Sequence, residues 1–569
     1  MHKKFVVPFV ALALALGNTA CKKDPETEPL YFITDDLEWD SVDRTAVYAQ
    51  QFLNDTYSYL PGGFDRLNGD FLDAAAGDAV PSRPNQVVEY YTNGQASVVV
   101  NPDPYWATAY AGIRRTNIFL ANIDRVPTTA ANVTLWKSEV RFMRAMLYFE
   151  LVKRYGGVPL VADKVFTLND NLLLPRNNYE ECVSYIAAEC DAIQGTLRKD
   201  ATLAAGDWGR ITQGAALALK GRLLLYAASP LFNGGQVNGA GALQGYPAAN
   251  ASRWQLALDA NLAVINLGYF ALNTPTPGVS TAYTSIFTTK MNKEIILAKQ
   301  AANSTTLENS QAPIGYNSTG VVSQGYTSPT QEFVDAFPTL TGAAVSSTAP
   351  VAYTARDPRL DGTVFYNGLQ WLSRPVQTFT GGLDRPGTSA IQTRTGYYLR
   401  KFLGNFATGT TYAATSHNFP IFRYAETLLN AAEAQNELGN TAAALDYVIQ
   451  IRRRSGLTAG TNSRYGVPTG LSQDDARTII RNERRIELSF EEHRFWDLRR
   501  WKTADVALSG QLTGVVATRS GAGTAASPYT FSYVRQPVST LVWQPRLYYM
   551  PLPYDEVTKN ANLVQNPGW

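Results

Sequence analysis

The chain has 569 residues, 45% hydrophobic and 17% charged, which suits one large folded body or two to three domains. Its 50 basic and 48 acidic residues nearly balance, and no basic run alternates with aromatic residues, so the sequence predicts no nucleic-acid partner. Only three histidines occur, His2, His417 and His493, so we expect no histidine-based metal site. No nucleophile, phosphate-loop or dinucleotide motif occurs in a credible context, so we expect no catalytic residues and no cofactor.

The first 21 residues follow the pattern of a secretory signal. A positive start at Lys3 and Lys4 precedes an apolar run from Phe5 to Leu16, and small residues lead to Cys21. This run is too short to span a bilayer, which takes about 20 apolar residues. The pattern resembles a lipoprotein signal, in which residues 1–20 are removed and Cys21 carries the lipid. Residues 21–38 are then predicted to be a flexible linker, and residues 39–569 a single body.

Apolar residues recur at intervals of three and four over several stretches, which predicts a mainly helical body. The expected helices run from Trp39 to the break at 57–63, through the pairs 106–126 with 135–155 and 179–197 with 212–231, and over 254–267. Cys182 and Cys190 fall eight residues apart on one of these helices, about 12 Å and too far for a disulfide, so both are predicted core residues.

The second half of the chain begins with a change of organisation. Residues 292–300 are predicted to be a strand or buried extended segment, and residues 301–420 are rich in Ser, Thr, Gly and Pro. We expect an irregular, loop-rich subdomain there, packed on the helices. Residues 423–438 and 441–454 then predict a helix hairpin hinged at Gly439, whose span of about 34 residues is the period of a tetratricopeptide unit. The sequence thus predicts a tetratricopeptide-like superhelix of about four helix pairs.

The stretch from Asn482 to Trp501, NERRIELSFEEHRFWDLRRW, combines many charges with many aromatic rings. A cap at Ser472 and apolar residues on one face predict a single helix through it. Opposite charges stand three residues apart and predict ion pairs on a solvated face. These expected pairs are Arg484 with Glu487, Glu491 with Arg494, and Asp497 with Arg500.

An alternative treats Glu483, Glu487 and Glu491 as glycosidase carboxylates. Glycoside hydrolysis needs two carboxyl groups that face each other across the substrate. These three glutamates lie along one predicted helix with an arginine beside each, so we expect a structural role for them.

This stretch resembles the C-terminal signature of SusD/RagB-like proteins, which reads roughly ERRxELxFEGxRxxDLxRW, with Glu492 in place of the usual small residue. Three further blocks are similar to the family, namely residues 423–440, RRRSGL at 452–457, and the closing PLPYDEVTKNANLVQNPGW at 551–569. Four blocks in the family's order make a chance match improbable.

The resemblance implies a lipid-anchored protein on the outer face of the outer membrane. Such a protein captures oligosaccharides and passes them to a SusC-like TonB-dependent transporter. A second interpretation keeps this scaffold and partner but has peptides as cargo, as in RagB-like members. A surface glycoside hydrolase and a tetratricopeptide-like envelope adaptor are the further alternatives.

Aromatic residues make up 11% of the chain, and several fall in predicted loops. An aromatic plane suits a sugar because the apolar face of a pyranose stacks on it while amide and guanidinium groups bind the hydroxyls. In the family such a site is built from loops, which points to Tyr90, Tyr91 and Asn93 and to Tyr326 and Trp371 further on. Neighbouring tyrosines on a strand point to opposite sides, so we expect at most one of Tyr90 and Tyr91 to face a ligand.

Overall fold

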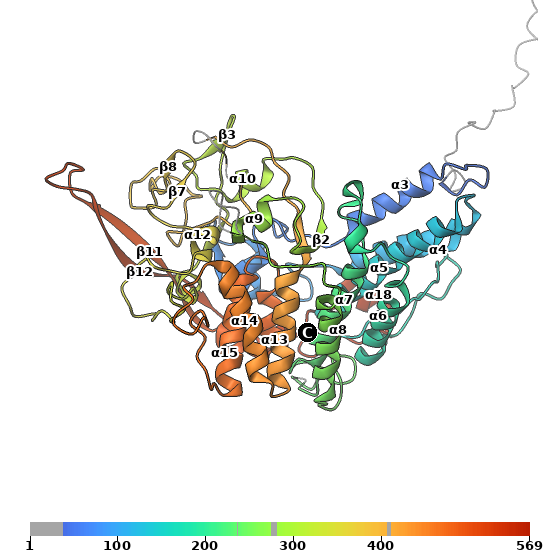
Figure 1. Ribbon diagram of the computed structural model, residues 1–569. Coiled ribbons are helices and arrows are strands. Elements are labelled where there is room, and N and C mark those ends of the chain that lie inside the picture. The colour runs from blue at the N-terminus through green and yellow to red at the C-terminus, as the bar shows by residue number, and fades with distance from the viewer. Residues whose placement is uncertain (1–37, 236, 275–281, 405, 407–410) are drawn as a thin grey trace, which may run out of the picture.

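The computed structural model describes residues 38–569 except 236, 275–281, 405 and 407–410. The predicted signal sequence, the lipidation of Cys21 and nearly all of the linker lie outside the described residues. The described part has a helical scaffold, a loop-rich region beside it and a hairpin that projects from the body (Figure 1). None of its helices combines the length and the apolar character that crossing a membrane requires.

Eight helices of 14 or more residues form the scaffold within the described ranges. Each contacts the next in the order given, so they build one continuous array of four pairs. They are α4 (Trp106–Asn122), α5 (Ala130–Tyr155), α6 (Tyr179–Ile193), α7 (Gln213–Ala228), α8 (Ser252–Ile265), α13 (Tyr424–Glu437), α14 (Thr441–Ser455) and α15 (Gln473–Glu487). The prediction of a mainly helical, tetratricopeptide-like scaffold is confirmed.

Local sequence sets the ends of these helices. The hydroxyl of Thr129 accepts a hydrogen bond from the Asn132 amide at 3.1 Å and caps the start of α5. Gly156 ends the same helix with φ of 79° and ψ of −144°, a backbone conformation that glycine adopts without steric cost. A Cβ atom there would stand 2.4 Å from the carbonyl oxygen of Leu243, so only glycine fits.

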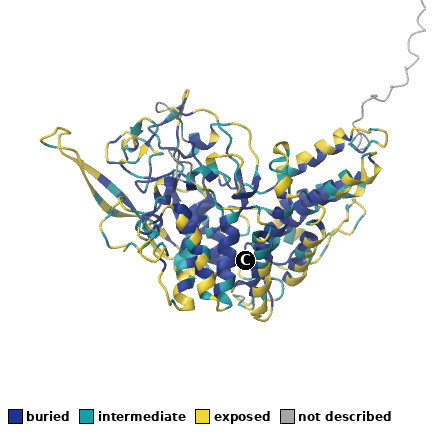
Figure 2. Ribbon diagram, in the orientation of Figure 1, coloured by how far each residue is buried: buried dark blue, intermediate teal, exposed yellow. Residues whose placement is uncertain are grey.

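The core runs through the middle of the array, where α5 and α7 are buried along much of their length (Figure 2). Gly221 lets α7 approach α8 closely, since a Cβ atom there would lie 2.7 Å from Oδ1 of Asn261. Cys182 and Cys190 are free and buried on α6, as predicted.

Helices α8 and α13 contact each other although the loop-rich region separates them in the sequence. In the described residues this region holds short helices and two-stranded antiparallel sheets. Two of these sheets join distant segments, namely β2 with β10 and β5 with β1 (Ala79–Pro81), a strand from the N-terminal part of the chain. Its elements are α9 (Ala282–Thr288), β2 (Ile295–Lys299), α10 (Thr306–Gln311), β3 (Asn317–Ser318), β4 (Val321–Val322), β5 (Thr327–Pro329), α11 (Gln331–Ala336), α12 (Arg359–Thr363), β6 (Val364–Phe365), β7 (Gln370–Trp371), β8 (Arg374–Pro375), β9 (Tyr398–Leu399) and β10 (Phe419–Arg423).

The remaining elements are short, apart from one hairpin. Before α4 lie α3 (Val47–Thr56), η1 (Tyr57–Tyr59), η2 (Leu72–Ala75), β1 (Ala79–Pro81) and η3 (Val87–Tyr91); between α4 and α8 lie η4 (Ile123–Arg125), η5 (Asp200–Thr202) and η6 (Ala205–Asp207); after α15 lie α16 (Arg494–Arg500), α17 (Ala504–Ala507), β11 (Gly510–Ser520), β12 (Thr530–Leu541), η7 (Pro545–Tyr548) and α18 (Tyr554–Lys559). The helix predicted from Trp39 onward thus starts at Val47, since residues 39–46 form turns. The hairpin β11–β12, whose far half is largely exposed, was not predicted.

The prediction of one helix from Asn482 to Trp501 is wrong. Helix α15 ends at Glu487 and α16 begins at Arg494, because Phe490 and Glu492 adopt left-handed backbone angles, with φ of 59° and 62°. Glycine favours this conformation, which explains why the family signature has a small residue at the position of Glu492. Here the Glu492 carboxylate binds the Arg66 guanidinium, with 2.9 Å between Nη2 and Oε2.

Candidate ligand-binding surface

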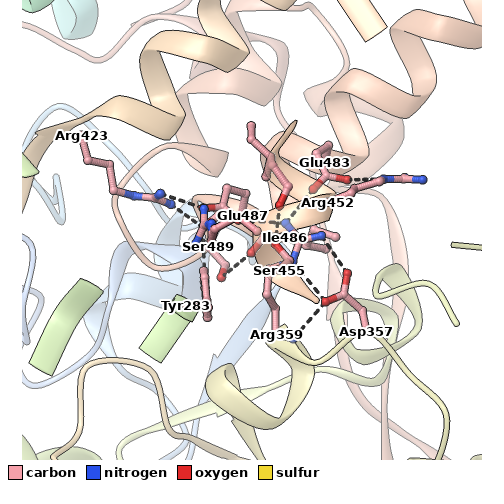
Figure 3. A network of polar contacts seen from close by, with 12 residues as sticks. Tyr283, Asp357, Arg359, Arg423, Arg452, Ser455, Glu483, Ile486, Glu487 and Ser489 are labelled. Atoms are coloured by element: carbon pink, nitrogen blue, oxygen red, sulfur yellow. Dashed lines mark hydrogen bonds and ion pairs between the residues drawn. The ribbon is translucent and has the colours of Figure 1, made fainter. Parts of the chain in front are cut away.

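Glu483 and Glu487 of α15 lie inside the protein, in a charge network that joins the scaffold to the loop-rich region (Figure 3). Glu487 accepts hydrogen bonds from Arg359 at 2.8 Å and Arg423 at 2.7 Å. Arg454 binds the same glutamate oxygen as Arg423. Arg359 also donates to Glu483 at 2.6 Å. Since Arg359 lies on α12 and Arg423 ends β10, the network fixes both segments against α15.

Of the three charge pairs predicted here, Asp497 with Arg500 forms, with 2.8 Å between Oδ1 and Nε. The prediction that these charges are solvated is wrong, since almost all of them are buried. The other predicted partners bind distant residues, because Arg484 binds Asp497, Glu487 binds Arg359, Arg423 and Arg454, Glu491 binds Lys401 and Arg423, and Arg494 lies 3.8 Å from Asp78.

The electrostatics of Glu487 suit a structural role. Burial by itself raises the pKa of this carboxyl, but Arg454, Arg423 and Arg359 hold it well below its usual range. A general acid must carry a proton near neutral pH, and a general base must reach the substrate. A fully buried carboxylate that several guanidinium groups keep ionised meets neither condition.

A different surface gathers the groups that a sugar requires. The pairing of β1 with β5 brings segment 82–86 beside Tyr326, whose carbonyl oxygen accepts a hydrogen bond from the Ser82 amide at 2.7 Å. The guanidinium of Arg83 lies over the Tyr326 ring, 3.7 Å from its centroid. Both side chains are half-buried, so the stacked pair is presented at the surface.

Amide groups surround this pair. Arg83 donates to the carbonyl oxygen of Asn68 at 2.8 Å, and the Asn68 side chain donates to that of Gln86 at 3.2 Å. Gly69 has φ of 94°, and a Cβ atom there would stand 2.5 Å from the Tyr326 ring. We call Asn68, Arg83, Gln86 and Tyr326 the Tyr326–Arg83 surface. It offers a ring, a cation and two amides, the set of groups from which shallow sugar sites are built.

Two carboxyl groups lie beneath this surface. Burial raises the pKa of Asp70 to about 7, although Arg83 opposes the change. Burial likewise raises the pKa of Asp65 to about 7, against hydrogen bonds from Ser310 and Gln311. The Gln311 amide donates to Asp65 at 2.6 Å and to the Gly69 carbonyl oxygen at 2.8 Å, which anchors the glycine turn.

The other predicted site residues have different surroundings. Tyr91 is 1% exposed, its ring packs on Phe495 and its hydroxyl donates to Asn101. Trp371 is 2% exposed and packs between Tyr316 and Phe365. Both rings belong to the core and present no face for stacking.

Tyr90 and Asn93 stay closer to the surface. Tyr90 is half-buried on η3, a 3-10 helix, so strand alternation does not apply to Tyr90 and Tyr91. The exposed Asn93 accepts a hydrogen bond from the Gln95 amide at 3.0 Å and pairs with Val542 beside the β12 strand. Of the predicted site residues, Tyr326, Tyr90 and Asn93 thus lie at or near the surface.

Arg83, Asn68 and Gln86 were not predicted as site residues. Each lies in a stretch without periodicity, and Arg83 is more than 240 residues from its aromatic partner. The stacked pair exists only because β1 and β5 are neighbours.

Two family models match the chain over separate ranges. The model described as SusD family matches residues 293–569, and the model described as starch-binding associating with outer membrane matches residues 36–225. Together they cover most of the sequence. The chain belongs to the SusD/RagB-like family.

Individual relatives agree in length and fold. SusD-like protein P2 of Formosa agariphila is 26% identical over the full length of both chains. A crystal structure of a SusD-like protein from Bacteroides fragilis is 29% identical, covers 94% of this chain and 99% of its own, and superposes with a TM-score of 0.76. A laminarin binding SusD-like protein is 21% identical, with coverage of 92% and 99% and a TM-score of 0.61.

Proposed function

We propose that this SusD-like protein binds an oligosaccharide at the Tyr326–Arg83 surface. The observation that carries the proposal is the half-buried Tyr326 ring held under Arg83 between the amides of Asn68 and Gln86. The name of the family model for starch-binding proteins and the laminarin-binding relative support carbohydrate as the class of cargo. The protein is proposed to bind its cargo without changing it.

The proposal extends to delivery. Cys21 is proposed to carry the lipid that holds the protein on the outer face of the outer membrane, where it passes its cargo to a SusC-like TonB-dependent transporter. Family membership supports this assignment. Replacing Cys21 with Ala should move the protein from the membrane fraction to the soluble fraction, and absence of fatty-acid labelling in the unchanged protein would contradict the anchor.

Calorimetry against a panel of neutral oligosaccharides tests the binding surface. Loss of a stacking ring in Tyr326→Ala should weaken binding by about 5- to 150-fold, on the scale of 1 to 3 kcal/mol for base stacking on aromatic rings. The matched control is Tyr529→Ala on the exposed hairpin. Tyr529 is 50% exposed and also lies under a guanidinium, 4.5 Å from that of Arg519. Equal effects in both variants would contradict the assignment.

The alternative cargo is a peptide, as in RagB-like members. Adding peptides to the same panel separates the two classes. Tight, Tyr326-dependent binding of a peptide with no binding of any oligosaccharide would replace the sugar proposal while leaving the surface in place.

A further inference from the structure

A cleft lies apart from the Tyr326–Arg83 surface, between α3 with η1, the loop at 206–210 and the end of β2. Its volume is about 490 Å³, within the range of pockets that hold small ligands. Asn54, Tyr57, Trp208, Arg210, Lys299 and Gln300 are among the residues that line it. None of them belongs to the Tyr326–Arg83 surface.

One aromatic ring in this cleft is available for stacking. Trp208 is half-buried, and it follows the short η6 helix in a turn that Gly209 completes with φ of 93°. Tyr57 instead serves as a wall, because its hydroxyl donates to the buried Glu139 at 2.5 Å. The indole plane of Trp208 is therefore the stacking surface that the cleft offers.

The two cationic side chains of the cleft differ in whether a carboxylate balances their charge. Arg210 lies 3.4 Å from Glu139 and donates to the Asn54 side chain at 2.5 Å, so its charge is balanced by a carboxylate. Lys299 donates to the carbonyl oxygens of Ser58 at 2.9 Å and Leu60 at 2.7 Å. Among the described residues, no carboxylate lies within ion-pair distance of its ammonium group.

An ammonium group has three N–H donors, and the two carbonyls occupy two of them. Burial lowers the pKa of the Lys299 ammonium because its charge is partly removed from water. An anion in the cleft would offset that cost and form a charge-assisted hydrogen bond, which is stronger than a neutral one. Asn54 and Gln300 also line the cleft, where Oδ1 of Asn54 accepts a hydrogen bond from Arg210 and Nε2 of Gln300 donates one to the carbonyl oxygen of Ala298. We expect the Asn54 amide nitrogen and the Gln300 amide oxygen to bind hydroxyl groups.

We propose that this cleft binds a sugar residue that carries a carboxylate, with the ring on Trp208 and the carboxylate on Lys299. It is a site in addition to the Tyr326–Arg83 surface. It rests on the proposed function only in taking carbohydrate as the class of ligand. A neutral sugar would stack equally well, but it would leave the Lys299 charge uncompensated.

The test compares methyl β-D-glucuronide with methyl β-D-glucoside, which differ in the carboxylate, by ligand-observed NMR titration of the full chain. The glucuronide should bind about tenfold more tightly or better, as a charge-assisted hydrogen bond predicts. Lys299→Met should abolish this preference, whereas Trp208→Ala should weaken both ligands by 5-fold or more. The matched control is Lys290→Met, an exposed lysine outside the cleft.

Several results would overturn the proposal. These are equal affinity for the two glycosides, no binding of the glucuronide, or a preference that survives Lys299→Met. Binding of tetraglutamate that depends on Trp208, without binding of either sugar, would assign the cleft to acidic peptides instead. The melting temperature shows whether Lys299→Met folds. If it does not, Trp208→Ala and Lys299→Arg test the proposal in its place. The arginine variant should retain the preference for the glucuronide.

The proposals for the two sites can be contradicted independently of each other. Tyr326→Ala should leave glucuronide binding in the cleft unchanged. Unchanged oligosaccharide affinity in Tyr326→Ala, with glucuronide binding in the cleft as expected, would contradict the proposed function alone. Unchanged oligosaccharide binding in Trp208→Ala, together with unchanged glucuronide binding, would contradict the cleft alone.

Discussion

Arginine has opposite surroundings in two regions of this protein. In the network around Glu487, the guanidinium of Arg359 is fully buried and bound by three carboxylates. On the Tyr326–Arg83 surface, the guanidinium of Arg83 lies over a ring, and its nearest carboxylate oxygen, on Asp70, is 3.4 Å away. In the first arrangement each nitrogen of the Arg359 guanidinium donates a hydrogen bond inside the protein, which holds segments together. The second keeps part of its hydrogen-bonding capacity at the surface, where a ligand can meet it.

The largest difference between the regions should appear on removing one charge from the network. Glu487→Gln leaves three guanidinium groups without their shared carboxylate, and breaking a buried pair costs about 3 to 5 kcal/mol. We expect urea titration to show this loss in the free energy of unfolding. The control Asp474→Asn removes an exposed pair with Arg477 and should cost less than about 1 kcal/mol. Similar losses in the two variants would show that the network contributes no more than a surface pair.

The pH dependence of stability separates the regions in a second way. Burial and the charge of Asp78 raise the pKa of Asp73 to about 8, above the ordinary value near 4. The folded state thus holds a proton that the unfolded state releases, so stability is greatest below pH 4 for this group and falls as the pH rises toward 8. Asp65 and Asp70 change the stability with pH in the same direction, because burial raises their pKa values to about 7. Glu487 changes the stability in the opposite direction, because its pKa is lowered and its stabilising contribution is lost in acid.

Asp73→Asn isolates this effect, since asparagine imitates the neutral carboxyl. Between pH 5 and pH 8 the free energy of unfolding of the unchanged protein should fall by about 2 kcal/mol or more relative to the variant, at about 1.4 kcal/mol per pKa unit. His493, whose pKa is lowered by burial and by Arg484, titrates in both proteins and cancels in the comparison. Parallel pH profiles for the two proteins would contradict the raised pKa.

A glycine pair tests the geometry of the surface itself. Gly69→Ala places a Cβ atom 2.5 Å from the Tyr326 ring, whereas Gly368→Ala, with a similar φ of 90°, meets no atom within 4 Å. Both variants carry the backbone strain of a left-handed alanine, about 1 to 2 kcal/mol. Gly69→Ala alone should also displace the ring and weaken oligosaccharide binding. Equal ligand affinity in both variants, measured by calorimetry, would show that the ring position does not matter.

The sequence predicted a region well where its contacts join residues that are close in the sequence, and poorly where they join distant segments. The scaffold helices were predictable because the spacing of residues such as Ala425, Leu428 and Leu429 is local and records a buried face. The partners of Glu487 were not, since Arg359 and Arg423 come from segments more than 60 residues away and the spacing rule pointed to Arg484. A short-range rule describes exposed helix faces, and here the face is buried.

The Tyr326–Arg83 surface also depends on contacts between segments that are distant in the sequence. Composition placed aromatic residues in loops and included Tyr326, but it could not separate that residue from Trp371, which packs in the core. The distinction depends on the β1–β5 pairing, which joins residues about 250 positions apart and has no periodic signal. The break after Glu487 was hidden because non-glycine residues adopt left-handed angles there.

Arg494 provides the smallest expected effect and the sharpest contrast with Glu487. The spacing rule paired Arg494 with Glu491, but its closest carboxylate is that of Asp78 at 3.8 Å, and Asp78 keeps a second partner in Arg485 at 2.5 Å. Burial and the charge of Arg485 lower the pKa of Arg494 to about 10, which indicates a guanidinium that its surroundings stabilise poorly. Arg494→Met keeps most of the side-chain volume and removes this poorly compensated charge.

We therefore expect Arg494→Met to change the free energy of unfolding by no more than about 1 kcal/mol, because replacing a poorly compensated buried charge with an apolar residue is often neutral. Oligosaccharide affinity should stay the same, since Arg494 lies outside the Tyr326–Arg83 surface. Urea titration and calorimetry on one preparation measure both quantities. A loss of stability as large as that of Glu487→Gln would show that Arg494 belongs to the network despite its distance from the carboxylates. A loss of affinity at unchanged stability would instead place a ligand contact near α16.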